Sequence, residues 1–423
     1  MWLFESASGC KMHRDPEAGK CKFLALGRWK GTLTQEDLPC NFFSLSDHLD
    51  MLGVTLKATY AATRKVNGDE LQDKVKKVVG PWRAGKFMPL TMRPFSLNTY
   101  AFPKLWHRCN TIDLRVGDVT AINKQAKAWL YADMLEKPEE LALYRHPVVG
   151  GLGLHHVQLR AVAYQISCFL ETSCNEKFIR NKYHEALLRY YVFEEDIHQP
   201  DQPPYFKGEF FPIIKRINQT PLNLSKLSLK QIYRFLLDEI TMKEELGATI
   251  LLPLKAEISS PQVQWDRVWA SARQKMLGPN ISSFIFKLLH QILPTAQRVS
   301  RILPNQSQNC SKCQVETQET IKHALFECTA NHGAGHVLLN GLKKIDPTLS
   351  QDRILTLDFE SEEDEKFAMV WITGAFFSTL WQLRVEKKRV ELMKIRSELE
   401  ANCRLLRESR LSKTSEILAE IFE

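Results

Sequence analysis

The sequence predicts a mainly α-helical protein with a small β component near its N-terminus, an α+β fold in which helices dominate. From about residue 71 onward, much of the chain repeats apolar residues every three or four positions, the period of one helix face. Only the first 60 residues mix short apolar runs with turn residues, as strands do. With 423 residues, 44% hydrophobic and 25% charged, the chain has the composition of a folded protein with several domains.

The β component rests on residues 20–27 and 51–56, which have the pattern of strands or strand ends. Residues 121–134 and 154–192 carry apolar side chains at helical spacing, and the prolines and glycines between them mark a break. The proline- and acid-rich segment 193–227 is predicted to be a linker. These patterns place a long helical region after the strands.

Helix signals return after the linker. Ser228 can cap a helix while the side chain of Gln231 reaches back to it, and an amphipathic helix follows over residues 281–292. An acidic stretch that ends at Glu365 is expected to form the negatively charged first turn of one long helix reaching about Arg410. The aromatic residues early in that helix are expected to lie in a core rather than to form a binding platform.

The strongest local signal is a set of four side chains with metal-ligand spacing, C-x2-C followed by H-x4-C: Cys310, Cys313, His323 and Cys328. Two thiolates on a tight turn and a His–Cys pair further on can supply the four corners of a tetrahedral Zn²⁺ site. The alternatives are three buried cysteines beside an unrelated histidine, or His332 or His336 in place of His323. Because four protein ligands leave no open position, a zinc ion here would be structural.

The cysteine usage also indicates a compartment. Clustered cysteines favour a metal over disulfides in a reducing environment, and the N-terminal residues do not resemble a signal peptide. No apolar run is long enough to suggest a membrane span. We therefore expect an intracellular protein, in the cytoplasm, the nucleus or both.

The net charge of +8 and the pI near 8.9 favour a polyanionic partner. A stretch with few acids carries the candidate nucleic-acid-binding residues Lys65, Lys74, Lys76, Lys77, Arg83, Lys86 and Arg93. Trp82 and Phe87 are interleaved with them, so cations can follow phosphates while an aromatic ring packs on a base or sugar. The alternative is a solvated helix face with Trp82 in the core.

Around the cysteines the chain resembles the zinc-binding domain of non-LTR (LINE-type) retrotransposon reverse transcriptases. The matching elements are a helix with two tryptophans, Trp265 and Trp269, the run FIFKLLHQILPT at 284–295, and CSKCQVETQETIKHALFEC at 310–328. The resemblance extends upstream, where residues 8–29 are similar to the stretch that follows the polymerase catalytic loop, although His13 stands where the family usually has Asn.

Further matches place parts of the polymerase on the chain. Leu52, Gly53 and Val54 resemble the primer-grip turn, with Met51 in place of the family's Tyr. Residues 97–105 and 147–154 are similar to stretches of the thumb, which would track a template–primer duplex through its backbone. The resemblance, which covers residues 1–335, implies a palm remnant at 1–60, from after the catalytic loop to the primer grip, a helical thumb-like region at 61–192, and a helical, helix-flanked CCHC zinc-binding domain at 228–335. The sequence pattern adds the linker at 193–227 and a C-terminal helical tail at 336–423.

The catalytic part of such an enzyme is not found in the sequence. A reverse transcriptase holds two metal ions with an early aspartate and an Asp-Asp pair, and this sequence has no Asp-Asp. The near-match Tyr131-Ala-Asp-Met134 lies in a helical pattern and has Met where the second carboxylate must be. The glycines at 150–153 indicate a turn, because they lack the register of a nucleotide loop. We also find no constellation typical of a nuclease, and we expect no enzyme activity and a chain that begins past the active site.

The function expected from these observations is binding of RNA or an RNA–DNA hybrid by a zinc-bearing fragment that does not polymerise and does not involve a membrane. The alternative is a captured retrotransposon fragment that acts as a protein-interaction or regulatory module. In that case the zinc would be purely structural and the helix at 365–410 would mediate self-association.

Overall fold

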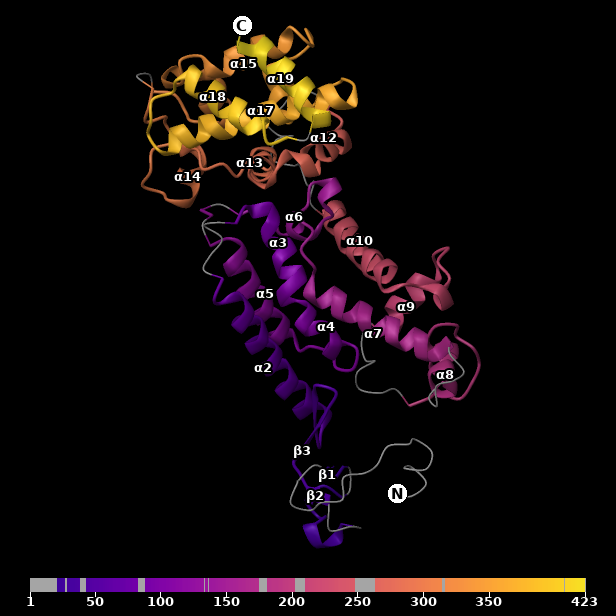
Figure 1. The fold of residues 1–423 in the computed structure, drawn as a ribbon. Helices are drawn as coiled ribbons and strands as arrows, with labels where there is room; N and C mark the ends of the chain where they lie inside the picture. The colour runs from indigo at the N-terminus through magenta and orange to yellow at the C-terminus, as the bar shows by residue number, and fades with distance from the viewer. Residues whose placement is uncertain are drawn as a thin grey trace. The chain divides into compact units, whose positions relative to one another are not determined.

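The structure, a computed structural model, describes residues 21–26, 29–38, 43–82, 88–132, 134, 135, 137–174, 181–201, 210–247, 263–313, 316–406 and 408–422. These residues are mainly helical with two small sheets, which confirms the predicted fold class (Figure 1). The chain divides into two compact units. Unit 1 comprises residues 1–81, 99–126 and 156–238, and unit 2 comprises residues 82–98, 127–155 and 239–423. The two units interleave along the chain, in contrast to the five consecutive parts expected from the sequence.

Unit 1 begins with the β structure. Strand β1 (Cys21–Phe23) pairs in parallel with β2 (Phe43–Leu45), and β3 (His48–Met51) forms an antiparallel hairpin with β4 (Val54–Lys57). A two-residue turn joins β3 to β4, with φ of 50° at Leu52 and 78° at Gly53. Positive φ at both central residues matches the twist of a hairpin, and it is strained for Leu52 but not for a glycine. The turn expected at 52–54 is therefore present, and its role as a primer grip is still a prediction.

The remaining helices of unit 1 are α2 (Tyr60–Val79), α4 (Pro103–Cys109), α7 (Val157–Cys174), α8 (Asn181–Tyr191) and α9 (Phe210–Asn218), with short 3-10 turns at Gln35–Asp37 and Leu224–Lys226. Helices α5 (Val116–Leu130) and α10 (Leu229–Gly247) contribute residues to both units. Helix α2 begins earlier than the apolar period suggests, because Thr59 caps it by accepting a hydrogen bond from the Ala62 N–H.

Helix α9 corrects the predicted linker. It lies inside the segment 193–227, and its apolar side chains are buried against α7, α8 and the start of α10: Phe210, Phe211, Ile213, Ile214 and Ile217. The prolines and acids around this helix hid its 3.6-residue period. The cap predicted for α10 is confirmed, because Ser228 N–H donates to Gln231 Oε1 at 2.9 Å while Gln231 N–H donates to Ser228 Oγ at 3.4 Å.

Unit 2 is built from α3 (Arg93–Ser96), α6 (Glu140–Tyr144), α12 (Trp265–Ala272), α13 (Pro279–Leu289), α14 (Ala296–Ile302), α15 (Ala334–Lys343), α16 (Gln351–Thr356), α17 (Glu363–Val385), α18 (Leu392–Cys403) and α19 (Glu408–Phe422). Short helical turns lie at Leu90–Met92, Pro147–Val149, Lys275–Leu277, His323–Glu327 and Thr329–Asn331, and a π-turn at Leu97–Ala101 crosses the boundary with unit 1. One apolar core runs through this unit from Val268 in α12 to Ile421 in α19. The residues expected to form a separate tail after 335 therefore share a core with the helices before the cysteines.

Helix α17 lies at the centre of this core and packs against α13, α15, α18 and α19 (Figure 1). The expectation of one helix from Glu365 to about Arg410 is wrong, because α17 ends at Val385 and two further helices follow. Trp371, Phe376 and Phe377 are buried, as predicted for core aromatics. The acidic first turn of α17 is also present, and Arg410 of α19 forms ion pairs with Glu363 and Asp364 in it.

The glycine-rich segment is a turn, as predicted. Gly150 follows the turn at 147–149 with φ of +86°, a conformation that favours glycine. A Cβ there would lie 2.5 Å from the Trp269 ring. His290 Nε2 donates to the Gly150 carbonyl at 2.8 Å, and burial lowers the pKa of His290 to about 4, so the imidazole is neutral at physiological pH. This turn therefore anchors α12 and α13, the helices that precede the cysteines.

Candidate metal centre

The four predicted ligands come from two short segments that follow α14. Cys310 and Cys313 lie on a loop, whose Cys310 N–H donates to the Thr317 carbonyl at 2.8 Å. His323 opens the turn His323–Glu327, and the Thr320 hydroxyl accepts its N–H at 3.0 Å. Cys328 ends that turn, and its N–H donates to the His323 carbonyl at 2.8 Å. These hydrogen bonds fix the backbone at Cys310, His323 and Cys328.

The donor atoms of these four residues all lie within 4.8 Å of one another. Cys310 Sγ and Cys328 Sγ are 3.8 Å apart, Cys313 Sγ is 3.4 Å from Cys328 Sγ, and His323 Nε2 is 3.3 Å from Cys313 Sγ. Tetrahedral Zn²⁺ with bonds of about 2.3 Å to sulfur and about 2.0 Å to nitrogen separates its ligands by roughly 3.5–3.8 Å. The cysteines are free, and their sulfurs lie far beyond the ~2.05 Å of a disulfide. The set can hold a metal ion and fits zinc.

The acidities of the thiols also fit a cation site. Burial opposes ionisation of Cys310, but hydrogen bonds from Arg384 and the Lys312 backbone lower its pKa to about 7. Cys313 is only partly buried, and hydrogen bonds with Thr329 and Cys328 lower its pKa to about 7. Burial and the nearby sulfurs raise the pKa of Cys328 to about 12. A metal cation bound among the three sulfurs would favour the ionised form of each thiol.

The alternative histidines are placed elsewhere. His332 and His336 are exposed, and neither belongs to the cluster formed by the described residues. Cys328 directly follows the turn His323–Glu327, whereas His332 follows the next turn, Thr329–Asn331, in a left-handed conformation. His323 is therefore the histidine of this centre.

Sequence reasoning missed a residue that donates hydrogen bonds to two of the sulfurs. Arg384, in the last turn of α17, donates from Nη1 to Cys328 Sγ at 3.4 Å and from Nη2 to Cys310 Sγ at 3.2 Å. Arg384 also forms an ion pair with Glu319, whose carboxylate accepts the Ala296 N–H at 2.7 Å. Arg384 is 56 residues from Cys328, so no local spacing indicated it.

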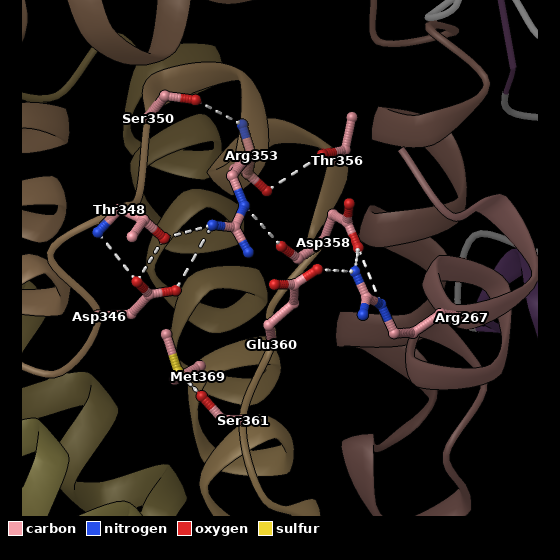
Figure 2. Close-up of polar contacts among 10 residues, drawn as sticks. All are labelled: Arg267, Asp346, Thr348, Ser350, Arg353, Thr356, Asp358, Glu360, Ser361 and Met369. Carbon is pink, nitrogen blue, oxygen red and sulfur yellow. Dashed lines mark hydrogen bonds and ion pairs between the residues drawn. The ribbon is translucent and has the colours of Figure 1, made fainter. Parts of the chain in front are cut away.

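A second polar network fixes α12 to the segment that precedes α17 (Figure 2). Arg267 of α12 donates to Asp358 Oδ1 from Nη2 at 2.7 Å and from Nε at 3.0 Å, and it pairs with Glu360 at 2.9 Å. Asp358 is buried, and Arg353 donates to its carbonyl at 3.2 Å. The tryptophan-bearing helix is thus joined by charge to residues outside the segment recognised from the sequence.

The structure describes five of the seven candidate nucleic-acid-binding residues. Lys65, Lys74, Lys76 and Lys77 are exposed on α2, where Asp69 and Asp73 are exposed among them. Arg93 is a correction, because it is 3% exposed and its guanidinium donates to the Met88 and Leu130 carbonyls at 2.9 and 2.7 Å. A guanidinium bound in this way is not available to a phosphate, and we withdraw that assignment. Arg83 and Lys86 lie outside the described residues.

The near-match to a catalytic loop begins where α5 ends. Tyr131 is buried in the turn after the helix, and the carboxylate-bearing Asp133 lies outside the described residues. Trp129 donates from its indole nitrogen to the Trp82 carbonyl at 2.9 Å, and the two rings are 5.5 Å apart. Trp82 is half-buried and packs against Trp129.

Residues 254–333 match a family model described as zinc-binding in reverse transcriptase. This region is related to reverse-transcriptase zinc-binding domains. The match covers about a fifth of the chain and includes α12, α13, α14 and all four donor residues. No curated protein matches the chain. Within the described part of the chain, no helix has the length and apolar character needed to cross a bilayer.

Proposed function

We propose that the protein is a nucleic-acid-binding fragment related to non-LTR retrotransposon reverse transcriptases, which binds RNA or an RNA–DNA hybrid with the help of a structural Zn²⁺. The observation that carries this proposal is the coincidence of the family match at 254–333 with the Cys₃His cluster. The positive net charge of +8 favours the same class of partner.

We further propose that the chain by itself does not polymerise nucleotides, because two-metal chemistry needs paired carboxylates and the sequence has no Asp-Asp. A primer-extension assay with Mg²⁺ or Mn²⁺ is expected to give no incorporation above that of a sample without protein. A metal-dependent product would refute this part. We place the protein inside the cell, in the cytoplasm or nucleus, where thiolates are kept available for zinc.

Lysine contacts with phosphates are supported by the exposure of Lys65, Lys74, Lys76 and Lys77 on α2. The test is fluorescence anisotropy with labelled single-stranded RNA and with an RNA–DNA hybrid, at salt concentrations from about 50 to 200 mM, over which phosphate contacts change the affinity strongly. Each phosphate contact contributes about 0.7–0.9 to the slope of log affinity against log salt. Replacing the four lysines by Gln should reduce both affinity and slope.

A matched control changes four other exposed lysines of unit 1 to Gln: Lys104, Lys182, Lys226 and Lys230. This variant loses the same charge, so any additional loss in the α2 variant measures the position of the lysines. If the two variants lose RNA affinity equally, the lysines of α2 contribute only through the net charge of the protein and not through their position. Absence of salt-dependent RNA binding by the unmodified protein would refute the proposed function.

The alternative, self-association through residues 365–410, finds less support. The apolar side chains of this segment are largely buried within unit 2: Phe367, Trp371, Phe376, Phe377, Leu380, Leu383, Ile395 and Leu399. A helix whose apolar face is already covered has little left to offer a second copy. Sedimentation velocity across a tenfold range of protein concentration should therefore give a constant species, and a concentration-dependent dimer insensitive to salt would favour the interaction module.

A further inference from the structure

The guanidinium of Arg384 is directed at the sulfurs of the metal centre from outside the family match. It is 7% exposed, and its Nη1 and Nη2 groups donate to two different sulfurs, those of Cys328 and Cys310. The match ends at residue 333, whereas Arg384 lies in the last turn of α17. The sulfurs therefore receive charged donors from a helix that the recognised segment does not include.

The charge of the site gives this arrangement a physical reason. A Zn²⁺ ion with three thiolates and a neutral imidazole carries one net negative charge, and the side chains that hold it are mostly buried. A buried charge is costly unless it is paired and hydrogen-bonded. Arg384 supplies a cation at 3.2 and 3.4 Å from two sulfurs, and the Lys312 ammonium donates a hydrogen bond to the Arg384 carbonyl. The positive charges of Arg384 and Lys312 together balance the negative charge of the zinc centre and that of the Glu319 carboxylate.

The ion pair with Glu319 does not by itself explain the orientation of Arg384. That pair is made by Nη2, whereas Nη1 donates to Cys328 Sγ. Glu319 is 8% exposed, and its carboxylate is fixed by a hydrogen bond from the Ala296 N–H. It can therefore hold the Arg384 guanidinium in place while Nη1 and Nη2 each donate to a sulfur. Glu319 thus orients Arg384, and Arg384 orients the thiolates.

We propose that Arg384 is a positioning residue of the metal centre, which strengthens zinc binding, shields the bound thiolates from electrophiles and makes the docking of α17 depend on the metal. Hydrogen bonds to a thiolate withdraw negative charge from sulfur, which makes it a poorer nucleophile. Partners of this kind typically contribute about 10–100-fold to metal affinity. The proposal rests on zinc occupying the four-ligand site and is independent of RNA binding.

The test uses the full chain with two variants. Arg384→Met keeps an unbranched apolar stem but removes the charge and the donors, and Arg384→Lys keeps the charge with one ammonium group in place of the guanidinium. The control is Arg389→Met, a change of the same type at an exposed arginine between α17 and α18. Zinc affinity is measured by competition with a chromophoric chelator. We expect about a 10–100-fold loss for Arg384→Met, a smaller loss for Arg384→Lys and none for the control.

Two readouts separate a role at sulfur from a general loss of stability. Iodoacetamide should alkylate the zinc-bound thiolates several-fold faster in Arg384→Met, and the sulfur-to-metal charge-transfer band of the Co²⁺-substituted protein should move to lower energy. Unchanged affinity would overturn the proposal. Weaker affinity with unchanged alkylation rate and charge-transfer energy would also overturn it, because Arg384 would then act only through packing.

If Arg384→Met does not fold, Arg384→Lys and Glu319→Gln carry the test, since the latter frees the guanidinium without removing it. Faster alkylation in both variants than in Arg389→Met supports the proposal, and rates equal to that control overturn it. A wild-type protein that binds no zinc would refute the metal centre itself, whereas failure of RNA binding alone would leave this inference standing.

Discussion

Replacing Gly341 by Ala tests whether the residues after 335 are part of the fold that carries the metal centre. Gly341 lies in α15 and faces α19, where a Cβ would stand 2.6 Å from Ile421 Cα and 2.7 Å from its Cγ1. The first of these is a backbone atom, so α19 has to move as a whole. In an open helix the same change stabilises by about 0.8–1.0 kcal/mol through helix propensity, whereas overpacking a core costs about 1–3 kcal/mol.

Because relief of the clash requires a shift of a packed helix, we take the upper part of the overpacking range, about 2–3 kcal/mol, which leaves a net destabilisation of about 1–2 kcal/mol. For a unit of this size that corresponds to a fall in Tm of roughly 2–8 °C. The measurement is thermal unfolding followed by tryptophan fluorescence, with zinc release recorded in parallel by a chromophoric chelator. We expect zinc to leave within the same transition, at the lower temperature.

Gly117→Ala provides the matched control. Gly117 lies in α5 and has nothing within 4 Å of a built Cβ, so the change should leave stability unaltered or raise it by up to about 1 kcal/mol. If Gly341→Ala stabilises the protein as much as Gly117→Ala does, α15 and α19 are not in contact. The view that residues 334–422 share the core of the zinc-bearing helices would then be wrong.

Four further predictions follow from individual contacts. Cys313→Ala removes one of four ligands and should abolish stoichiometric zinc in elemental analysis of the purified protein, whereas retained zinc would show that the ligand set is different. Burial lowers the pKa of His290 from 6.5 to about 4, so its neutral imidazole contributes fully to the free energy of unfolding above pH 6.5. As the pH falls toward 4, up to about 3 kcal/mol of that free energy is lost. His290→Gln should therefore flatten the pH dependence of urea unfolding between pH 6.5 and 4. Gly150→Ala places a Cβ 2.5 Å from the Trp269 ring at a φ of +86° and should lower stability by about 2–4 kcal/mol in the same assay, so a neutral effect would exclude the tight turn. Asp358→Asn weakens the ion pair with Arg267, in which the Asp358 side chain is buried and the Arg267 side chain is about a quarter exposed. The free energy of unfolding in urea should fall by roughly 1–3 kcal/mol. Because the pair is largely shielded from solvent, this loss should change little at high salt, and a loss that disappears at high salt would show that the pair is solvated.

The basic stretch at 64–93 shows where reasoning from the sequence stops. The run of cations predicts exposure, and for the lysines of α2 the structure agrees. Arg93 belongs to the same run but lies where two carbonyl groups, of Met88 and Leu130, are within reach of its guanidinium. Leu130 is 37 residues away, so no pattern within a helical turn could have indicated this partner.

The end of α17 is a second example. Gly and Pro are the usual signals of a helix end, and neither occurs between Arg384 and Arg396. The helix nevertheless ends, with Lys387 at a φ of +56° in the left-handed region. Packing of α18 and α19 against α17 selects this turn at the expense of local strain. A continuous helix was therefore the reasonable expectation and the wrong one.

The sequence by itself determined the predominance of helices, the cap at Ser228 and the four donor residues of the metal centre. Each of these depends on residues separated by a few positions or one short loop, so spacing along the chain is enough to specify it. The tertiary structure decided that the last three helices share a core with the zinc-bearing segment, that α9 is part of a core, and that Arg384 faces two of the sulfurs. Such contacts join residues far apart in sequence, and many arrangements of amphipathic helices satisfy the same local pattern until packing selects one of them.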